Sequence, residues 1–207
     1  MIMKKFIPLI FLMSFNLSAH PVIYKGGWSL SSSNMPDYSN NYVMYSLNQR
    51  LALGVEHWRL TKNEINNELG LLKLNHLLWR ANGEDYQSNV YLHGGLGIED
   101  QEFETKSTRG TWLLGAEADW ETRKLYSSVK YLQFQDVYFG QMRLGFAPKE
   151  ASFEELQTWF MIQAMIINNV NQKLTITPMM RFFYHNSLWE IGSSTQGDWM
   201  INLMVHY

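Results

Sequence analysis

The chain has 207 residues, enough for one domain, and carries a formal charge of −2. Because it has no cysteine, disulfides, thiolate metal sites and cysteine nucleophiles are excluded. The near-neutral charge, without a basic cluster, predicts no nucleic-acid partner. Aromatic residues make up 14% of the chain, yet past the amino terminus no apolar run approaches the roughly 20 residues of a membrane helix. This combination is typical of a β-barrel, whose two faces cancel in a running average of hydropathy.

The amino terminus is typical of an export signal. Two lysines precede an apolar stretch over residues 6–15, and Leu17–Ser18–Ala19 supplies a small-residue cleavage site. The apolar stretch is too short to span a bilayer as a helix. We therefore predict that residues 1–19 form a cleaved signal peptide and that residues 20–207 form one mature domain outside the cytoplasm.

Alternating polar and apolar residues recur about a dozen times after this signal, with turn-forming clusters between the runs. The predicted strands cover residues 22–31, 40–48, 50–59, 67–79, 88–98, 110–120, 124–134, 138–147, 155–167, 173–184, 187–193 and 198–207. An amphipathic helix from Phe153 to Ile167 is the alternative for the ninth of these. An even number of strands returns both termini to one side. We therefore predict an all-β, antiparallel up-and-down transmembrane barrel of about 12 strands, with 10 or 14 as alternatives.

The connections of this barrel should differ between its two ends. The loops predicted to face away from the termini are residues 32–39, 60–66, 99–108, 135–137, 168–172 and 194–197. Longer loops are expected at that end, where the polar segments 61–67 and 99–109 would lie. Residues 81–87 and 149–154 are long for turns on the side of the termini.

The last nine residues form an amphipathic strand that ends in an aromatic residue. Trp199, Ile201, Leu203, Val205 and Tyr207 share one face, as period-two geometry requires. Alone, this pattern also fits the last strand of a soluble sandwich.

Such an ending resembles the carboxy-terminal signal of Gram-negative outer-membrane β-barrel proteins, and with the export signal and the alternation the whole chain resembles that class. The segment from His20 to Trp28 is also similar to the mature start of small proteobacterial barrels, although no site residue can be carried over. The resemblance implies a location in the outer membrane, contact with outer-membrane lipids, and recognition of the carboxy-terminal strand by the barrel-assembly machinery.

Alternation also assigns charged side chains to the inside of the barrel. In the strand over 110–120, Trp112 and Leu114 face lipid, whereas Glu117 and Asp119 face inward. An Arg or Lys on the lipid face at mid-bilayer costs about 2–4 kcal/mol, so the charges are expected in a wet lumen. The predicted lumen-facing charges are Lys25, Glu56, Lys73, Glu117, Asp119, Lys130, Arg143 and Arg181. The aromatic residues predicted to form the membrane girdles are Trp28, Trp112, Trp120, Tyr138, Tyr184, Trp199 and Tyr207.

These inner charges allow two interpretations. Opposite charges can pair across the interior and fill it, which describes a structural membrane protein with a polar lumen. Alternatively, the cations can oppose the carboxylates at a selectivity constriction, which describes a small-solute channel.

A lipid-modifying enzyme is one further alternative. The outer-membrane phospholipase and the lipid A deacylases use a Ser/His pair that faces the bilayer. His57 and His76 are expected on the lipid face, but neither has a serine two residues away. His93–Gly94–Gly95 fits a curving strand, and His185–Asn186–Ser187 fits a turn. The sequence therefore predicts no enzyme.

A barrel that handles a soft metal such as Cu(I) is the last alternative, since thioether and imidazole ligands favour such ions. The residues expected on the inner face for this purpose are Met44, Met161, Met165, Met179, Met200, Met204, His93 and His206. Methionine is also a flexible apolar filler, and that interpretation is preferred. We therefore predict no cofactor and no metal site.

Overall fold

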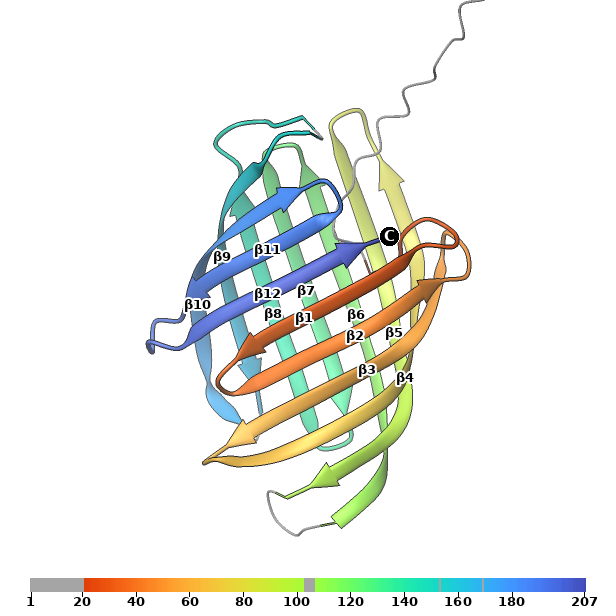
Figure 1. The fold of residues 1–207 in the computed structure, drawn as a ribbon, viewed down its shortest axis with the longest axis vertical. Coiled ribbons are helices and arrows are strands. Elements are labelled where there is room, and N and C mark those ends of the chain that lie inside the picture. Colours follow the sequence, from red (N-terminus) through yellow and green to blue (C-terminus); the bar gives the residue numbers. More distant parts are fainter. Residues whose placement is uncertain (1–20, 103–106, 153, 169) are drawn as a thin grey trace, which may run out of the picture.

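The computed structural model describes residues 21–102, 107–152, 154–168 and 170–207, which form a closed antiparallel barrel of twelve strands (Figure 1). The strands are β1 (Trp28–Met35), β2 (Tyr38–Ser46), β3 (Leu51–Lys62), β4 (Ile65–Asn82), β5 (Tyr86–Gln101), β6 (Ser107–Thr122), β7 (Leu125–Phe134), β8 (Val137–Phe146), β9 (Gln157–Ile167), β10 (Asn171–Tyr184), β11 (Ser187–Ser193) and β12 (Trp199–His206). The predicted twelve-stranded up-and-down barrel is confirmed. The helical alternative for the ninth element is wrong for the part the structure describes, because Gln157–Ile167 is a strand.

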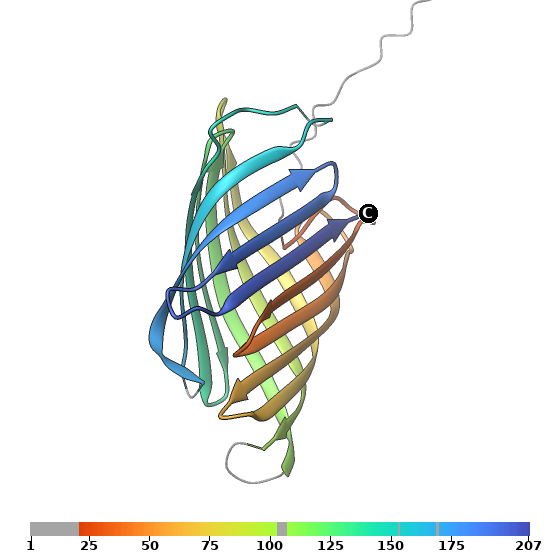
Figure 2. The ribbon, with the colours of Figure 1, turned by 60° about the vertical axis from the view of Figure 1, so that its left-hand side comes forward.

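Each strand pairs with its neighbours in the sequence, and β1 pairs with β12 to close the sheet. The closing register runs from Ser29 opposite His206 to Asn34 opposite Ile201. Closure leaves no strand edge unpaired, which is the condition for a sheet to cross hydrocarbon. Figure 2 shows the strongly tilted strands wrapping around the barrel axis. No helix long and apolar enough to cross a membrane is found in the described ranges. The predicted signal peptide, residues 1–19, lies outside them.

The first strand begins later than predicted, at Trp28 instead of residue 22. Gly26 has a φ of +85°, a left-handed conformation that interrupts an extended chain. The residues before it turn into the barrel: the Pro21 carbonyl accepts a hydrogen bond from the Asn75 amide at 3.3 Å, and Val22 is 2% exposed. Residues 21–23 therefore reach into the interior, whereas Tyr24, Lys25 and Gly26 are exposed. They do so at the barrel end where β1 begins and β12 ends, referred to as the end of the termini.

The connections also differ from the prediction. Half of the predicted loop over 99–108 is strand, since β5 continues to Gln101 and β6 starts at Ser107. Cross-strand polar contacts extend this hairpin, such as the 2.6 Å hydrogen bond from the Thr108 hydroxyl to Asp100. The longest connection, residues 147–156, lies at the end of the termini. The expectation of longer loops at the opposite end is therefore wrong.

The outer wall of the barrel is largely apolar and exposed, as shown by Leu72 at 72%, Leu114 at 61% and Met142 at 56%. The predicted girdle aromatics all lie on this wall. Those near the strand ends on the side of the termini are Trp28, Trp120, Tyr184 and Tyr207, and those toward the other end are Trp112, Tyr138 and Trp199.

Candidate functional site

The barrel interior is the candidate site, and its two ends are packed with apolar side chains. At the end of the termini, buried residues including Val22, Met44 and Tyr91 form one cluster. A larger cluster fills the opposite end and reaches down the wall of β9. Both clusters contain side chains with no exposure at all, such as Tyr91 and Leu113. Water therefore does not reach these inward side chains, as it would in a wide pore.

Four aromatic rings close the end opposite the termini. The ring of Trp58 lies 5.1 Å from that of Phe134 and 5.5 Å from that of Phe139, both edge-on. The ring of Tyr38 lies 6.1 Å from that of Trp58. Edge-on rings at these separations are favourable aromatic contacts. This group of Tyr38, Trp58, Phe134 and Phe139, from β2, β3, β7 and β8, is called the aromatic cluster below.

Between the apolar clusters lies a layer of charged side chains, of which the first group joins β3 to β4. The Lys73 ammonium lies 2.5 Å from a Glu56 oxygen, with side-chain exposures of 2% and 0%. The Asn40 amide donates a hydrogen bond of 2.9 Å to the same carboxylate. The ammonium also lies 5.3 Å from the centre of the Tyr42 ring. The two buried charges are thus neutralised by each other and by polar neighbours.

A second group joins β5, β6 and β7 around Glu117. Its carboxylate lies 3.2 Å from the Lys130 ammonium and 3.3 Å from His93 Nε2. The other ring nitrogen of His93 lies 2.8 Å from the Asn75 side-chain oxygen. Asp119, on the same strand as Glu117, accepts a 2.6 Å hydrogen bond from an amide on β5.

A third group surrounds Glu190, on β11. Arg181 approaches its carboxylate at 2.7 Å, Arg143 at 3.2 Å, and the Asn202 amide donates to it at 2.6 Å. The guanidinium of Arg181 also stacks 4.5 Å from the Tyr126 ring centre. Glu190 therefore shares its charge between two cations from two other strands.

The charged layer surrounds a cavity of about 110 Å³ inside the barrel. Its charged lining residues are Glu117, Lys130, Arg143, Arg181 and Glu190, three cations against two carboxylates. A cavity of this size with several polar partners has room for ordered water. It has a net positive lining.

The structure places seven of the eight predicted inner charges on the inner side of the wall, in these groups rather than in one ring. Lys25 requires a correction: it is exposed and precedes β1, because the extended chain starts only after the turn at Gly26. Sequence reasoning missed Glu190. The signal was present, since Glu190 alternates with the outward Trp189 and Ile191.

The residues considered for lipid hydrolysis are not brought together. His57 lies on the outer wall, with Nε2 3.6 Å from a Glu68 oxygen. The nearest serine in the register is Ser32 on β1, but Asn41 on β2 lies between it and His57. No hydroxyl of the described residues is hydrogen-bonded to His57. A buried contact of 2.9 Å joins the Ser29 hydroxyl to His206 Nδ1, on the side of the wall away from lipid.

The inner methionines pack as apolar side chains. Met161, Met165, Met179 and Met200 all belong to the larger apolar cluster, and the Gln163 amide lies 3.8 and 3.6 Å from the sulfurs of Met165 and Met200. The described ranges contain no group of three or more His, Asp or Glu residues arranged to hold a metal ion.

No family model matches the chain, and no curated protein is detectably similar to it in sequence. Among solved structures, the KdgM porin in complex with disordered oligogalacturonate is 10% identical, with 87% of this chain and 98% of that one covered at a TM-score of 0.48. OccK8 (OprE) of Pseudomonas aeruginosa is 10% identical, and the match covers 82% of this chain and 57% of that one at a TM-score of 0.41. A loop-deletion mutant of OmpT, an outer membrane protein of Vibrio cholerae, is 8% identical, and the match covers 88% of this chain and 97% of that one at a TM-score of 0.29. These neighbours are outer-membrane β-barrel proteins, the class that the sequence resembles, and the likeness concerns architecture alone.

Proposed function

We propose that the protein is an outer-membrane barrel that forms a narrow channel for small polar or anionic solutes, closed in the conformation described above. The observation that carries the proposal is the layer of paired charges around the 110 Å³ cavity, between the two apolar clusters of the interior.

The outer wall supports the membrane location. Its side chains include Leu96 at 70% and Ile98 at 60% exposure, in addition to Leu72 and Leu114. A continuous apolar surface around a soluble protein would drive aggregation, whereas hydrocarbon solvates it. Together with the predicted export signal, this wall favours the outer membrane.

The charged layer supports transport over simple filling. Replacing a buried ion pair by apolar residues of similar volume is often neutral or stabilising, so stability alone does not explain such pairs. Apolar side chains fill both ends of this interior, which shows that the scaffold accepts them. Charged side chains that line a narrow pore are a usual means of selecting solutes, and a lining of three cations against two carboxylates favours anions.

Opening would require two changes. Residues 21–23, at the start of the described chain, are held in the interior by few bonds. These are the bond from the Asn75 amide to the Pro21 carbonyl and the 3.2 Å bond from the Ile23 backbone N–H to the Ser46 hydroxyl. A short segment with few bonds detaches at lower cost than a strand of the closed sheet. The aromatic cluster would have to part at the other end.

The test is conductance of the refolded barrel in planar bilayers. We expect a low conductance for the mature chain and a higher one when deletion of residues 20–25 is combined with Trp58→Ala, because both ends are then opened. Each change alone should have a smaller effect. Absence of conductance in every variant would identify a permanently filled barrel.

Ion selectivity tests the charged layer itself. Arg143→Glu changes the cavity lining from three cations and two carboxylates to two and three, so the preference of the opened barrel should move toward cations. Lys149→Glu, at a side chain 80% exposed on the connection after β8, is the matched control and should leave selectivity unchanged.

Location has its own test. The mature chain should fractionate with the outer membrane and migrate faster on a gel before heating than after it. Deleting Tyr207 should reduce insertion but leave export intact. Recovery as a soluble periplasmic protein would refute the membrane assignment.

A further inference from the structure

On the outer wall, polar side chains of β1 lie beside apolar side chains of β12. Ser32 and Asn34 point outward from β1, and their register partners on β12 are Leu203 and Ile201, exposed at 40% and 50%. The polar side chains thus lie beside side chains that face hydrocarbon. A polar group in hydrocarbon is costly unless it is hydrogen-bonded, so this place should have a polar partner.

The hydrogen bonds within this group leave both a donor and an acceptor. The Ser32 hydroxyl donates to the Asn41 side-chain oxygen at 2.7 Å, and the Asn34 amide donates to the Ser32 hydroxyl at 2.9 Å. These bonds use the oxygen of Asn41 and the nitrogen of Asn34. Among the described residues, no side chain or backbone group bonds the Asn41 nitrogen or the Asn34 oxygen. A ligand carbonyl could accept a hydrogen bond from the Asn41 nitrogen, and a ligand N–H or O–H could donate one to the Asn34 oxygen.

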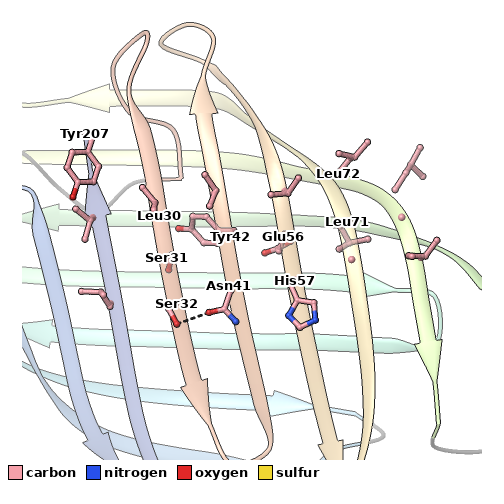
Figure 3. A pocket seen from close by; sticks show the side chains of 18 residues that line it. Leu30, Ser31, Ser32, Asn41, Tyr42, Glu56, His57, Leu71, Leu72 and Tyr207 are labelled. Atoms are coloured by element: carbon pink, nitrogen blue, oxygen red, sulfur yellow. Dashed lines mark hydrogen bonds between the residues drawn. The ribbon is translucent and has the colours of Figure 1, made fainter. Parts of the chain in front are cut away.

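Ser32 and Asn41 border a hollow of about 870 Å³ in the wall across β12 and β1 to β5. Asn34 lies two residues farther along β1, just outside this hollow. The lining of the hollow is mainly aliphatic, including Leu30, Val55, Leu72 and Leu203. Figure 3 shows Ser32, Asn41 and His57 in one row across three strands at one end of it. Gly70 deepens the hollow, because a Cβ at this position would meet no atom within 4 Å.

The outward residues of β3 also change from apolar to polar along the strand. Val55 is apolar and 54% exposed, His57 follows two residues later, and Arg59 two residues after that, toward the end opposite the termini. Glu68 approaches His57 at 3.6 Å and is the register partner of Arg59. The guanidinium of Arg59 has no ion-pair partner among the described residues.

We propose that this hollow binds one lipid of the leaflet opposite the termini, of the kind that has amide-linked acyl chains and a phosphorylated sugar headgroup. One acyl chain would lie along Leu30, Val55 and Leu72. Its amide and hydroxyl groups would pair with Asn34 and Asn41, and its phosphate would meet Arg59. Glycerophospholipids fit less well, because their ester linkages accept hydrogen bonds but do not donate them. The inference shares the membrane location proposed above and is independent of the channel.

The test is native mass spectrometry of the refolded barrel in mild detergent, titrated separately with lipid A and with phosphatidylethanolamine. We expect one retained lipid A and about tenfold weaker retention of phosphatidylethanolamine. Gly70→Phe fills the hollow from outside and should weaken lipid A retention by about tenfold. Gly94→Phe is the matched control: a Cβ there also meets no atom within 4 Å, and Gly94 does not line the hollow, so retention should be unchanged.

Asn41→Leu tests the headgroup chemistry separately from the hollow. This variant should still retain lipid, but without the preference for lipid A. Three results would overturn the proposal: full retention in Gly70→Phe, an unchanged preference in Asn41→Leu, or a dimer of the barrel that Gly70→Phe dissociates. The last result would show that a second copy occupies the hollow. None of these measurements depends on conductance.

Discussion

Ion pairs occur both in the middle of the barrel and at its rim, and they differ in their access to water. Glu56 and Lys73 are 0% and 2% exposed, whereas Arg109 and Asp136, near the hairpin ends opposite the termini, are 34% and 69% exposed at an N–O distance of 3.1 Å. At the rim, water replaces a lost partner. In the middle, a charge without its partner has no such substitute. The same chemical contact should therefore contribute very differently to stability in the two regions.

The largest effect is expected from breaking the interior pair on one side only. Glu56→Leu leaves the Lys73 ammonium buried without its carboxylate and should lower the free energy of unfolding by about 3–5 kcal/mol. The double variant Glu56→Leu/Lys73→Met should cost much less, since neither charge remains. Guanidinium unfolding of the barrel in lipid vesicles measures both. If the single and double variants were equally stable, water would have to reach the Glu56–Lys73 pair itself.

A charge placed on the outer wall tests the contrast from the lipid side. Leu114, on β6, is 61% exposed, and Leu114→Arg should lower the free energy of unfolding by about 2–4 kcal/mol at a depth near the bilayer midplane. Leu114→Met keeps the volume and should cost less than about 1.5 kcal/mol. A spin label at position 114 should report hydrocarbon, whereas one at Glu117 should report a polar interior. Identical environments at both positions would contradict the strand's membrane crossing.

The smallest effect is expected at the rim. Asp136→Asn removes the exposed partner of Arg109, which keeps its 3.0 Å contact with Glu99. The expected loss is about 0–1 kcal/mol, and it should shrink as salt is raised. Unfolding measured at low and high ionic strength checks this. A loss comparable to that of Glu56→Leu would mean that the rim is as dry as the middle layer.

The alternation in the sequence was enough to predict the closed twelve-stranded fold. Lipid requires apolar side chains on every second residue, so Trp112 and Leu114 on one face and Glu117 and Asp119 on the other specify both the strand and its orientation. The same rule could have found Glu190. It could not show that Trp58 or Leu113 packs the interior, because a period of two says which side a residue faces and not what it meets there.

Only the tertiary structure decided how the inner side chains are partnered. Arg143 meets Glu190 across 47 positions of sequence, and the Asn34 and Ile201 strands meet only through barrel closure. The entry of residues 21–23 into the interior depends on a cavity that exists only in the closed barrel. Which side chains of a strand face lipid and which face the interior depends only on the local alternation of apolar and polar residues, so the sequence alone determined it. Partners, packing and the polar place on the outer wall depend on register and closure, which bring distant strands side by side.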